Sequence, residues 1–196
     1  MNHSTEKLHR FGIKIFFEPG TTPDPSRCIP IFHRWIRERS LGGVLIDVAD
    51  YTHLTDGPSV LLVGHEGNLS FDTLDQRAGL FYSRKRFSPD PFQARVIDAA
   101  RMLFSACQLL EKDPSLDQVV RFQGNELQFV SNDRLVAPPD EITAREIGEQ
   151  LGPLMENCYT DSHYEVTNVS NGNNRLRISL KSNKDISVTT LLSRII

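Results

Sequence analysis

The sequence predicts an α+β fold in which three or four helices pack on one mainly antiparallel sheet. Three observations favour this class. Three β-prone segments follow one another between residues 44 and 83 with no helical pattern between them, which is typical of an antiparallel meander. Helical patterns preceded by capping residues occur elsewhere in the chain. Hydrophobic residues make up 39% and charged residues 24% of the 196 residues, as in an average globular protein.

The first half of the chain is predicted to form a strand, a helix and the meander. Residues 12–17 are apolar and β-prone and end at a turn that contains proline and glycine. A proline can begin a helix over 30–39, whose apolar side chains share one face. Residues 44–48 and 60–63 are nearly continuous apolar runs, which indicates central strands covered on both faces, and 79–83 is a shorter third strand.

The next predicted elements are a helix and a hairpin. Residues 90–110 begin with an aspartate and a proline that suit a helix start, and their apolar residues recur at helical spacing. Gly124-Asn125, taken as a two-residue loop, pairs the apolar residues on either side of it on one face. We therefore expect a β-hairpin over 120–129.

The last part of the chain is predicted to add a helix, a second hairpin and a short helix. Thr143 and Glu146 form a capping box at the start of the longer helix. Residues 164–167 and 176–180 are β-prone and flank a polar run, and residues 188–196 have the spacing of a short amphipathic helix. The predicted order is therefore β-α-β-β-β-α-β-β-α-β-β-α.

The length of the chain favours one α+β domain over 1–196, with a weak candidate boundary near 113–117. The net charge of −3 does not support a nucleic-acid partner or an anionic membrane surface. No apolar run approaches the roughly 18 residues that are needed to cross a bilayer. We therefore expect neither nucleic acid nor membrane among the partners.

The cysteines predict a reducing compartment. Cys28, Cys107 and Cys158 are an odd number at wide spacing, which is not a disulfide framework, and no C-x-x-C pair is present. The first ten residues contain no apolar segment of the kind found in signal peptides. These observations predict a cytoplasmic protein.

Most of the candidate reactive side chains lie between residues 47 and 72. One hypothesis is a Zn²⁺ or Fe²⁺ site made by His65 with Glu66 or Asp72, and with His53 as a further ligand. The sequence does not contain the H-E-x-x-H motif, and in a simple meander the ends of neighbouring strands point in opposite directions. The alternative is that these side chains cap turns and bond backbone groups.

Two further hypotheses concern the same region. Asp47 interrupts an apolar strand, so burial would raise its pKa and make it a catalytic candidate, together with His65 and Glu66. The alternative for Asp47 is a structural carboxylate. Glycines at 64 and 67 could bring backbone N–H groups close to a ligand, so the predicted ligand-binding residues are Gly64, His65, Gly67 and Asn68. The alternative there is a turn or a bulge.

Two surface features complete the candidates. Residues 84–86 are all basic and have aromatic neighbours. One hypothesis is that this basic run contacts phosphate. The alternative is that it protects a sheet edge from association with other sheets. The C-terminal apolar stripe predicts either a helix that closes the core or a surface for a homo-oligomer. It consists of Val188, Leu191, Leu192, Ile195 and Ile196.

The leading functional hypothesis is a cytosolic, non-catalytic module that binds a protein partner or a small ligand. It depends on the ordinary charge of the chain and on the absence of a complete catalytic motif from the sequence. The alternative is a metal-assisted hydrolase that uses the region of His65, Glu66 and Asp72. The sequence indicates no particular cofactor.

Overall fold

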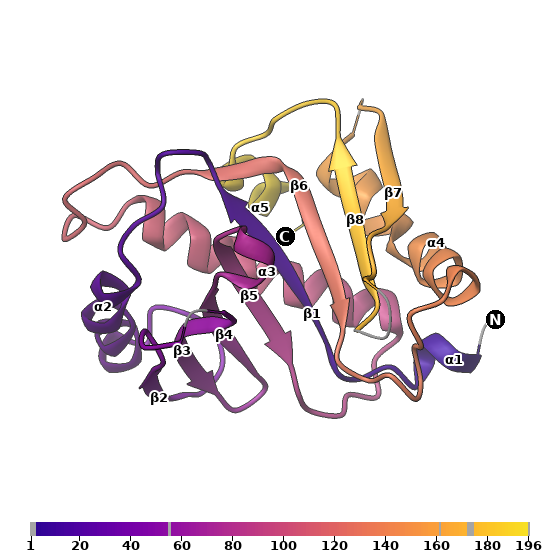
Figure 1. The fold of residues 1–196 in the computed structure, drawn as a ribbon, viewed down its shortest axis with the longest axis horizontal. Coiled ribbons are helices and arrows are strands. Elements are labelled where there is room, and N and C mark those ends of the chain that lie inside the picture. The colour runs from indigo at the N-terminus through magenta and orange to yellow at the C-terminus, as the bar shows by residue number, and fades with distance from the viewer. Residues whose placement is uncertain (1–2, 55, 161, 172–174, 196) are drawn as a thin grey trace.

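A computed structural model describes residues 3–54, 56–160, 162–171 and 175–195. Its eight strands form one antiparallel sheet in the order β2-β3-β4-β5-β1-β6-β8-β7 (Figure 1). The strands are β1 (Phe11–Phe17), β2 (Leu45–Asp50), β3 (Pro58–Gly64), β4 (Gly67–Asp72), β5 (Gly79–Arg84), β6 (Phe122–Ser131), β7 (Tyr164–Asn168) and β8 (Arg177–Ser182). The helices are α1 (His3–Glu6), α2 (Pro25–Glu38), the 3₁₀ turn η1 (Leu74–Gln76), α3 (Phe92–Glu111), α4 (Glu141–Cys158) and α5 (Val188–Arg194).

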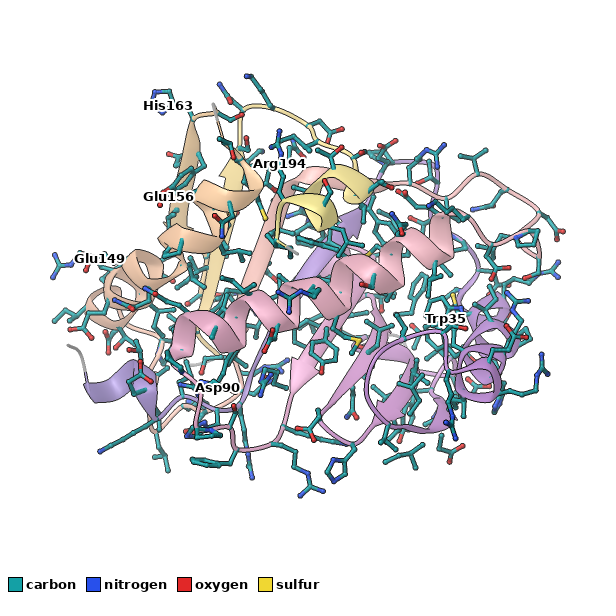
Figure 2. The ribbon with its side chains drawn as sticks, turned by 180° about the vertical axis from the view of Figure 1, so that it is seen from behind. Trp35, Asp90, Glu149, Glu156, His163 and Arg194 are labelled. Carbon is teal, nitrogen blue, oxygen red and sulfur yellow. The ribbon has the colours of Figure 1, made fainter. Side chains whose placement is uncertain are left out.

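The predicted α+β class is confirmed, and the predicted order of elements is consistent with the observed one. The four longer helices cover one face of the sheet, with α3 lying across its middle (Figure 2). Strand β1 is buried along its whole length because it lies between β5 and β6 in the sheet. Its odd-numbered residues, such as Ile13 and Ile15, join the core beneath the helices.

On the other face of the sheet, charged pairs cover the centre. Lys14 of β1 forms a buried ion pair with Asp72 of β4. Arg77, which follows η1, donates two hydrogen bonds to Glu126 at 2.7 and 3.0 Å and lies over the ring of Phe16 at 3.6 Å. Desolvation by burial lowers the pKa of Lys14, and the attraction of Asp72 opposes that shift.

The apolar run 44–48 does not form a central strand as predicted. It forms most of β2, which is an edge strand of the sheet. Val44 and Ile46 are 66% and 55% exposed. Hydrophobicity alone could not reveal this position, since an exposed apolar edge and a buried apolar strand have the same composition.

The predicted hairpin at Gly124-Asn125 is also wrong, because β6 runs through both residues as one strand. A side chain at Gly124 would collide with the backbone carbonyl oxygen of Ile186, so the glycine allows a close approach between chain segments rather than a turn. Strand β4 was not among the predicted elements. Its Leu69 and Phe71 alternate with polar residues and point into the core.

The C-terminal stripe lies in the core. Val188, Leu191 and Ile195 are buried, and α5 packs on α3, α4 and β6, while Ile196 lies outside the described residues. Leu192 is partly buried against the same core, so the described part of the stripe favours the predicted helix that closes the core over a surface for a homo-oligomer. The sheet also continues across the candidate boundary at 113–117, because β1 pairs with β5 on one side and with β6 on the other.

Candidate functional site

A groove of about 480 Å³ lies between α4 and the edge strand β7. Its helix wall and strand wall come from consecutive elements of the chain, which pack against each other beside β8. Its lining residues are Glu141, Ala144, Arg145, Gly148, Glu149, Gly152 and Glu156 of α4, and Tyr164, Val166 and Asn168 of β7. The volume falls in the range typical of binding sites.

Small residues form the floor of the groove. Ala144, Gly148 and Gly152 recur every four residues and therefore share one face of α4. At Gly148 the helix approaches β7 so closely that an added Cβ atom would lie 2.9 Å from Val166 Cγ1. At Gly152 no atom lies within 4 Å of such a Cβ, so the groove opens there. The helix continues past Pro153 to Cys158.

Carboxylates dominate the charge of the helix wall. Glu141, Glu149 and Glu156 face the groove together with a single base, Arg145. Glu141 accepts a hydrogen bond of 2.8 Å from the side-chain amide of Asn168, which joins the two walls at one end. Within the described part of the chain, the carboxylates of Glu149 and Glu156 have no ion-pair or hydrogen-bond partner, and both side chains are exposed on α4 (Figure 2). The groove therefore presents unpaired negative charge.

The strand wall presents backbone groups as well as side chains. In the β7–β8 pair, Asn183 N donates to His163 O and Val169 N donates to Arg177 O, both at 3.0 Å. Since hydrogen-bonded pairs alternate along antiparallel strands, the N–H and C=O groups of Tyr164, Val166 and Asn168 point away from β8. These groups have no backbone partner among the described residues.

At the other edge of the sheet, a side chain of β2 bonds an outward backbone N–H group of the same strand. The same alternation points the N–H of Val48 outward from β2, and Asp47 Oδ1 accepts that hydrogen bond at 2.8 Å. In the turn that follows β2, Asp50 Oδ1 accepts from Thr52 N at 2.8 Å. A bulge between Leu45 and Asp47 also interrupts this edge. Asp47 is exposed, so the desolvation that made it a catalytic candidate does not occur.

The predicted ligand-binding residues lie around the turn between β3 and β4. Gly64, His65 and Gly67 border a hollow of only about 50 Å³, which also contacts Tyr82 and Met102. Asn68 lies outside this hollow, and its side chain accepts a hydrogen bond of 3.0 Å from Lys85. The two glycines permit close backbone packing, since an added Cβ on either would lie 2.6 Å from a carbonyl oxygen.

The structure does not bring the predicted metal ligands together. His65 and Glu66 are exposed in the β3–β4 turn and bond each other at 2.8 Å. Asp72 ends β4, so roughly 16 Å of strand separates it from Gly67 at ~3.3 Å per residue. His53 follows β2, at the same end of the sheet as Asp72. Among the described residues, no group of three His, Cys, Asp or Glu side chains is placed to hold a metal ion.

The remaining candidates have structural partners. Lys85 bonds Asn68, and Arg86 donates to the His65 carbonyl at 3.4 Å, so part of the basic run 84–86 supports the β3–β4 turn. Cys28, Cys107 and Cys158 are buried free thiols. Burial raises the pKa of Cys28 and of Cys158 to about 12, which keeps both thiols protonated and unreactive.

A comparison with protein-family models found no match, and a comparison with curated proteins found none. The groove therefore has to be interpreted from its own geometry. None of the lining residues of the groove was among the predicted site residues, although Gly148 and Gly152 are two glycines inside one predicted helix. Their four-residue spacing was the available signal, since it places both glycines on one helix face.

Proposed function

We propose that the protein is a non-catalytic module that binds a protein partner through the groove between α4 and β7. The observation that carries this proposal is the combination, in one groove, of two carboxylates and a strand edge that have no partner among the described residues. Ile142, Val166 and Val169 are exposed apolar residues close to this groove in the chain. Apolar contacts of this kind beside polar groups are typical of protein interfaces.

A small ligand at the β3–β4 turn receives less support. The hollow beside Gly64 and Gly67 measures about 50 Å³, whereas sites for small molecules usually measure roughly 300–1,000 Å³. A metal-assisted hydrolase would need ligands other than the set His65, Glu66 and Asp72, because Asp72 lies at the far end of β4 and pairs with Lys14. A protein partner is therefore the better supported form of the proposal.

We extend the proposal to a reducing compartment, the cytosol. The three cysteines are buried and free, as expected where thiols stay reduced. No helix in the described part of the chain is both long and apolar enough to cross a membrane. Self-association is not part of the proposal, since Val188, Leu191 and Ile195 of the C-terminal stripe are buried in the core.

Affinity capture with matched charge variants tests the proposal. Wild-type protein is compared with the double variant Glu149→Lys/Glu156→Lys, and the captured proteins are identified by mass spectrometry. The control is Glu38→Lys/Asp117→Lys, which makes the same change of charge at exposed positions outside the groove. We expect a partner that is captured by wild type and by the control and is lost with the groove variant.

Calorimetry with the purified partner then confirms that the interaction is direct and measures its affinity. A partner bound equally by all three proteins would contradict the groove as the binding site. A folded wild-type protein that captures nothing would contradict the proposed function itself.

A further inference from the structure

We infer that the groove takes an extended segment of the partner as a ninth strand on β7, and that this segment carries lysine or arginine at alternate positions. This inference rests on the proposed function and specifies the chemistry of the partner. Extended peptides that add to a sheet edge gain affinity from main-chain hydrogen bonds and specificity from alternate side chains.

The backbone of β7 is ready for such an addition. Tyr164, Val166 and Asn168 direct N–H and C=O groups outward at every second residue, which is the pattern that another strand pairs with. The opposite edge of the sheet differs, since the carboxylate of Asp47 already occupies the N–H of Val48. Of the two edges, β7 is therefore the one suited to accept a strand.

The charge of the groove specifies the side chains of the added strand. Residues paired with Tyr164 and Val166 would point to the same face of the sheet as those two side chains, toward α4. There they meet Glu156 and Glu149, whose Cα atoms are about 10 Å apart at 1.5 Å per helical residue. Alternate strand residues are roughly 7 Å apart. Long, flexible basic side chains can span the difference between this spacing and that of the two glutamates.

The glycines of α4 suit this arrangement. Gly152 leaves open space beside the helix, so the aliphatic stem of a lysine or arginine can lie along α4 there. The acidic walls would repel a segment with glutamate or aspartate at the same positions. The inferred segment therefore alternates basic residues with others that point away from α4.

Fluorescence anisotropy with a defined peptide tests the inference. The probe is a labelled nine-residue peptide in which lysine alternates with valine, and glutamate replaces lysine in a second peptide. Two further peptides carry N-methyl groups on the lysine amides or on the valine amides. The added strand is taken as antiparallel to β7, as β8 is, and in that arrangement only the lysine amides face β7. The valine-methylated peptide is therefore the matched control for the stiffness that methylation introduces.

We expect the lysine peptide to bind wild type, with affinity that falls as salt rises, and the glutamate peptide not to bind. Methylation of the lysine amides should weaken binding about tenfold or more, whereas methylation of the valine amides should not, since several main-chain hydrogen bonds are lost only in the first case. Glu149→Gln/Glu156→Gln should weaken binding about fivefold and flatten its salt dependence.

Val166→Pro provides a test on the protein side. Proline is tolerated at an edge position whose N–H faces outward, so the variant should keep the circular dichroism spectrum of wild type while losing the peptide. A lysine peptide that does not bind, or that binds equally with either methylation pattern, would overturn strand addition. If the captured partner still depends on Glu149 and Glu156 in that case, the proposed function stands and only this inference fails.

Discussion

Gly148 of α4 packs directly against the side chain of Val166 of β7. An added Cβ at Gly148 would lie 2.9 Å from Val166 Cγ1, closer than real Cβ atoms approach. This contact holds the helix close to the edge strand, and one turn later Gly152 leaves the space that opens the groove. The candidate site therefore depends on two glycines that have different roles.

Gly152→Ala should stabilise the protein by about 0.5–1 kcal/mol, because alanine is the better helix former and nothing obstructs its methyl group. Gly148→Ala should gain less, since Val166 must shift. Urea unfolding measures both variants. A Gly148→Ala variant that is more stable than Gly152→Ala would contradict the close contact described here.

Gly124→Ala should destabilise the protein by about 2 kcal/mol or more. The added methyl group meets the backbone carbonyl of Ile186, which cannot rotate away as a side chain can. The free energy of unfolding in urea measures the loss, with Gly152→Ala as the control for a glycine in open space. An unchanged midpoint would show that the 183–187 segment does not lie against β6 as described.

Asp72→Asn should cost about 3 kcal/mol or more, because it leaves the buried ammonium group of Lys14 without its carboxylate. The double variant Lys14→Met/Asp72→Asn should lose less, since it removes the unpaired charge as well. Chemical unfolding of the two single variants and the double variant forms a double-mutant cycle. Additive losses would indicate that the two side chains do not interact.

Glu111→Gln should show a pH-dependent gain in stability. Burial raises the pKa of Glu111, so the folded state disfavours its ionised form, and this cost grows as pH rises above the ordinary glutamate range. Glutamine can still accept the hydrogen bond that Phe122 N donates at 3.1 Å. The variant should therefore be more stable than wild type at pH 7, and the difference should disappear as pH falls below about 4.

Unfolding curves of both proteins between pH 4 and pH 7 measure this difference. A gain that increases toward low pH would have the wrong sign and would contradict the partial burial of the Glu111 carboxylate.

Unfolding should occur in one transition. The sheet crosses the candidate boundary at 113–117, so both halves of the chain share β1 and its neighbours. The fluorescence of Trp35, the single tryptophan, reports on α2, whereas far-ultraviolet circular dichroism reports on all elements. The two signals should give the same midpoint in urea. Separate midpoints would indicate two units.

Much of the fold could be predicted from the sequence because local patterns and tertiary structure agree over most of the chain. The apolar run of β1 and the helical spacing of α3 each lead to the observed element. The errors arose where one pattern has two structural meanings. Gly124-Asn125 is a good turn sequence, but the glycine meets a neighbouring segment instead. The apolar residues of β2 lie at an exposed edge rather than in the centre.

The candidate site could not be predicted because it depends on how α4 and β7 pack. Glu149 and Glu156 are ordinary surface residues in the sequence, and they become part of a groove only when an edge strand lies beside the helix. The region 47–72 was predicted to hold a site because its residue types are reactive. In the sheet, Asp72 lies at the opposite end of β4 from His65. A local pattern of residue types cannot predict this separation, because the separation depends on how the strands pair.

Amide hydrogen exchange with and without the captured partner tests the central claim most directly. Binding in the groove should slow exchange in residues 164–168 and leave β2 unchanged, because the outward N–H groups of β7 become covered. Unchanged exchange in residues 164–168, together with protection at β2 or at the β3–β4 turn, would place the partner elsewhere and contradict the proposed function of this groove.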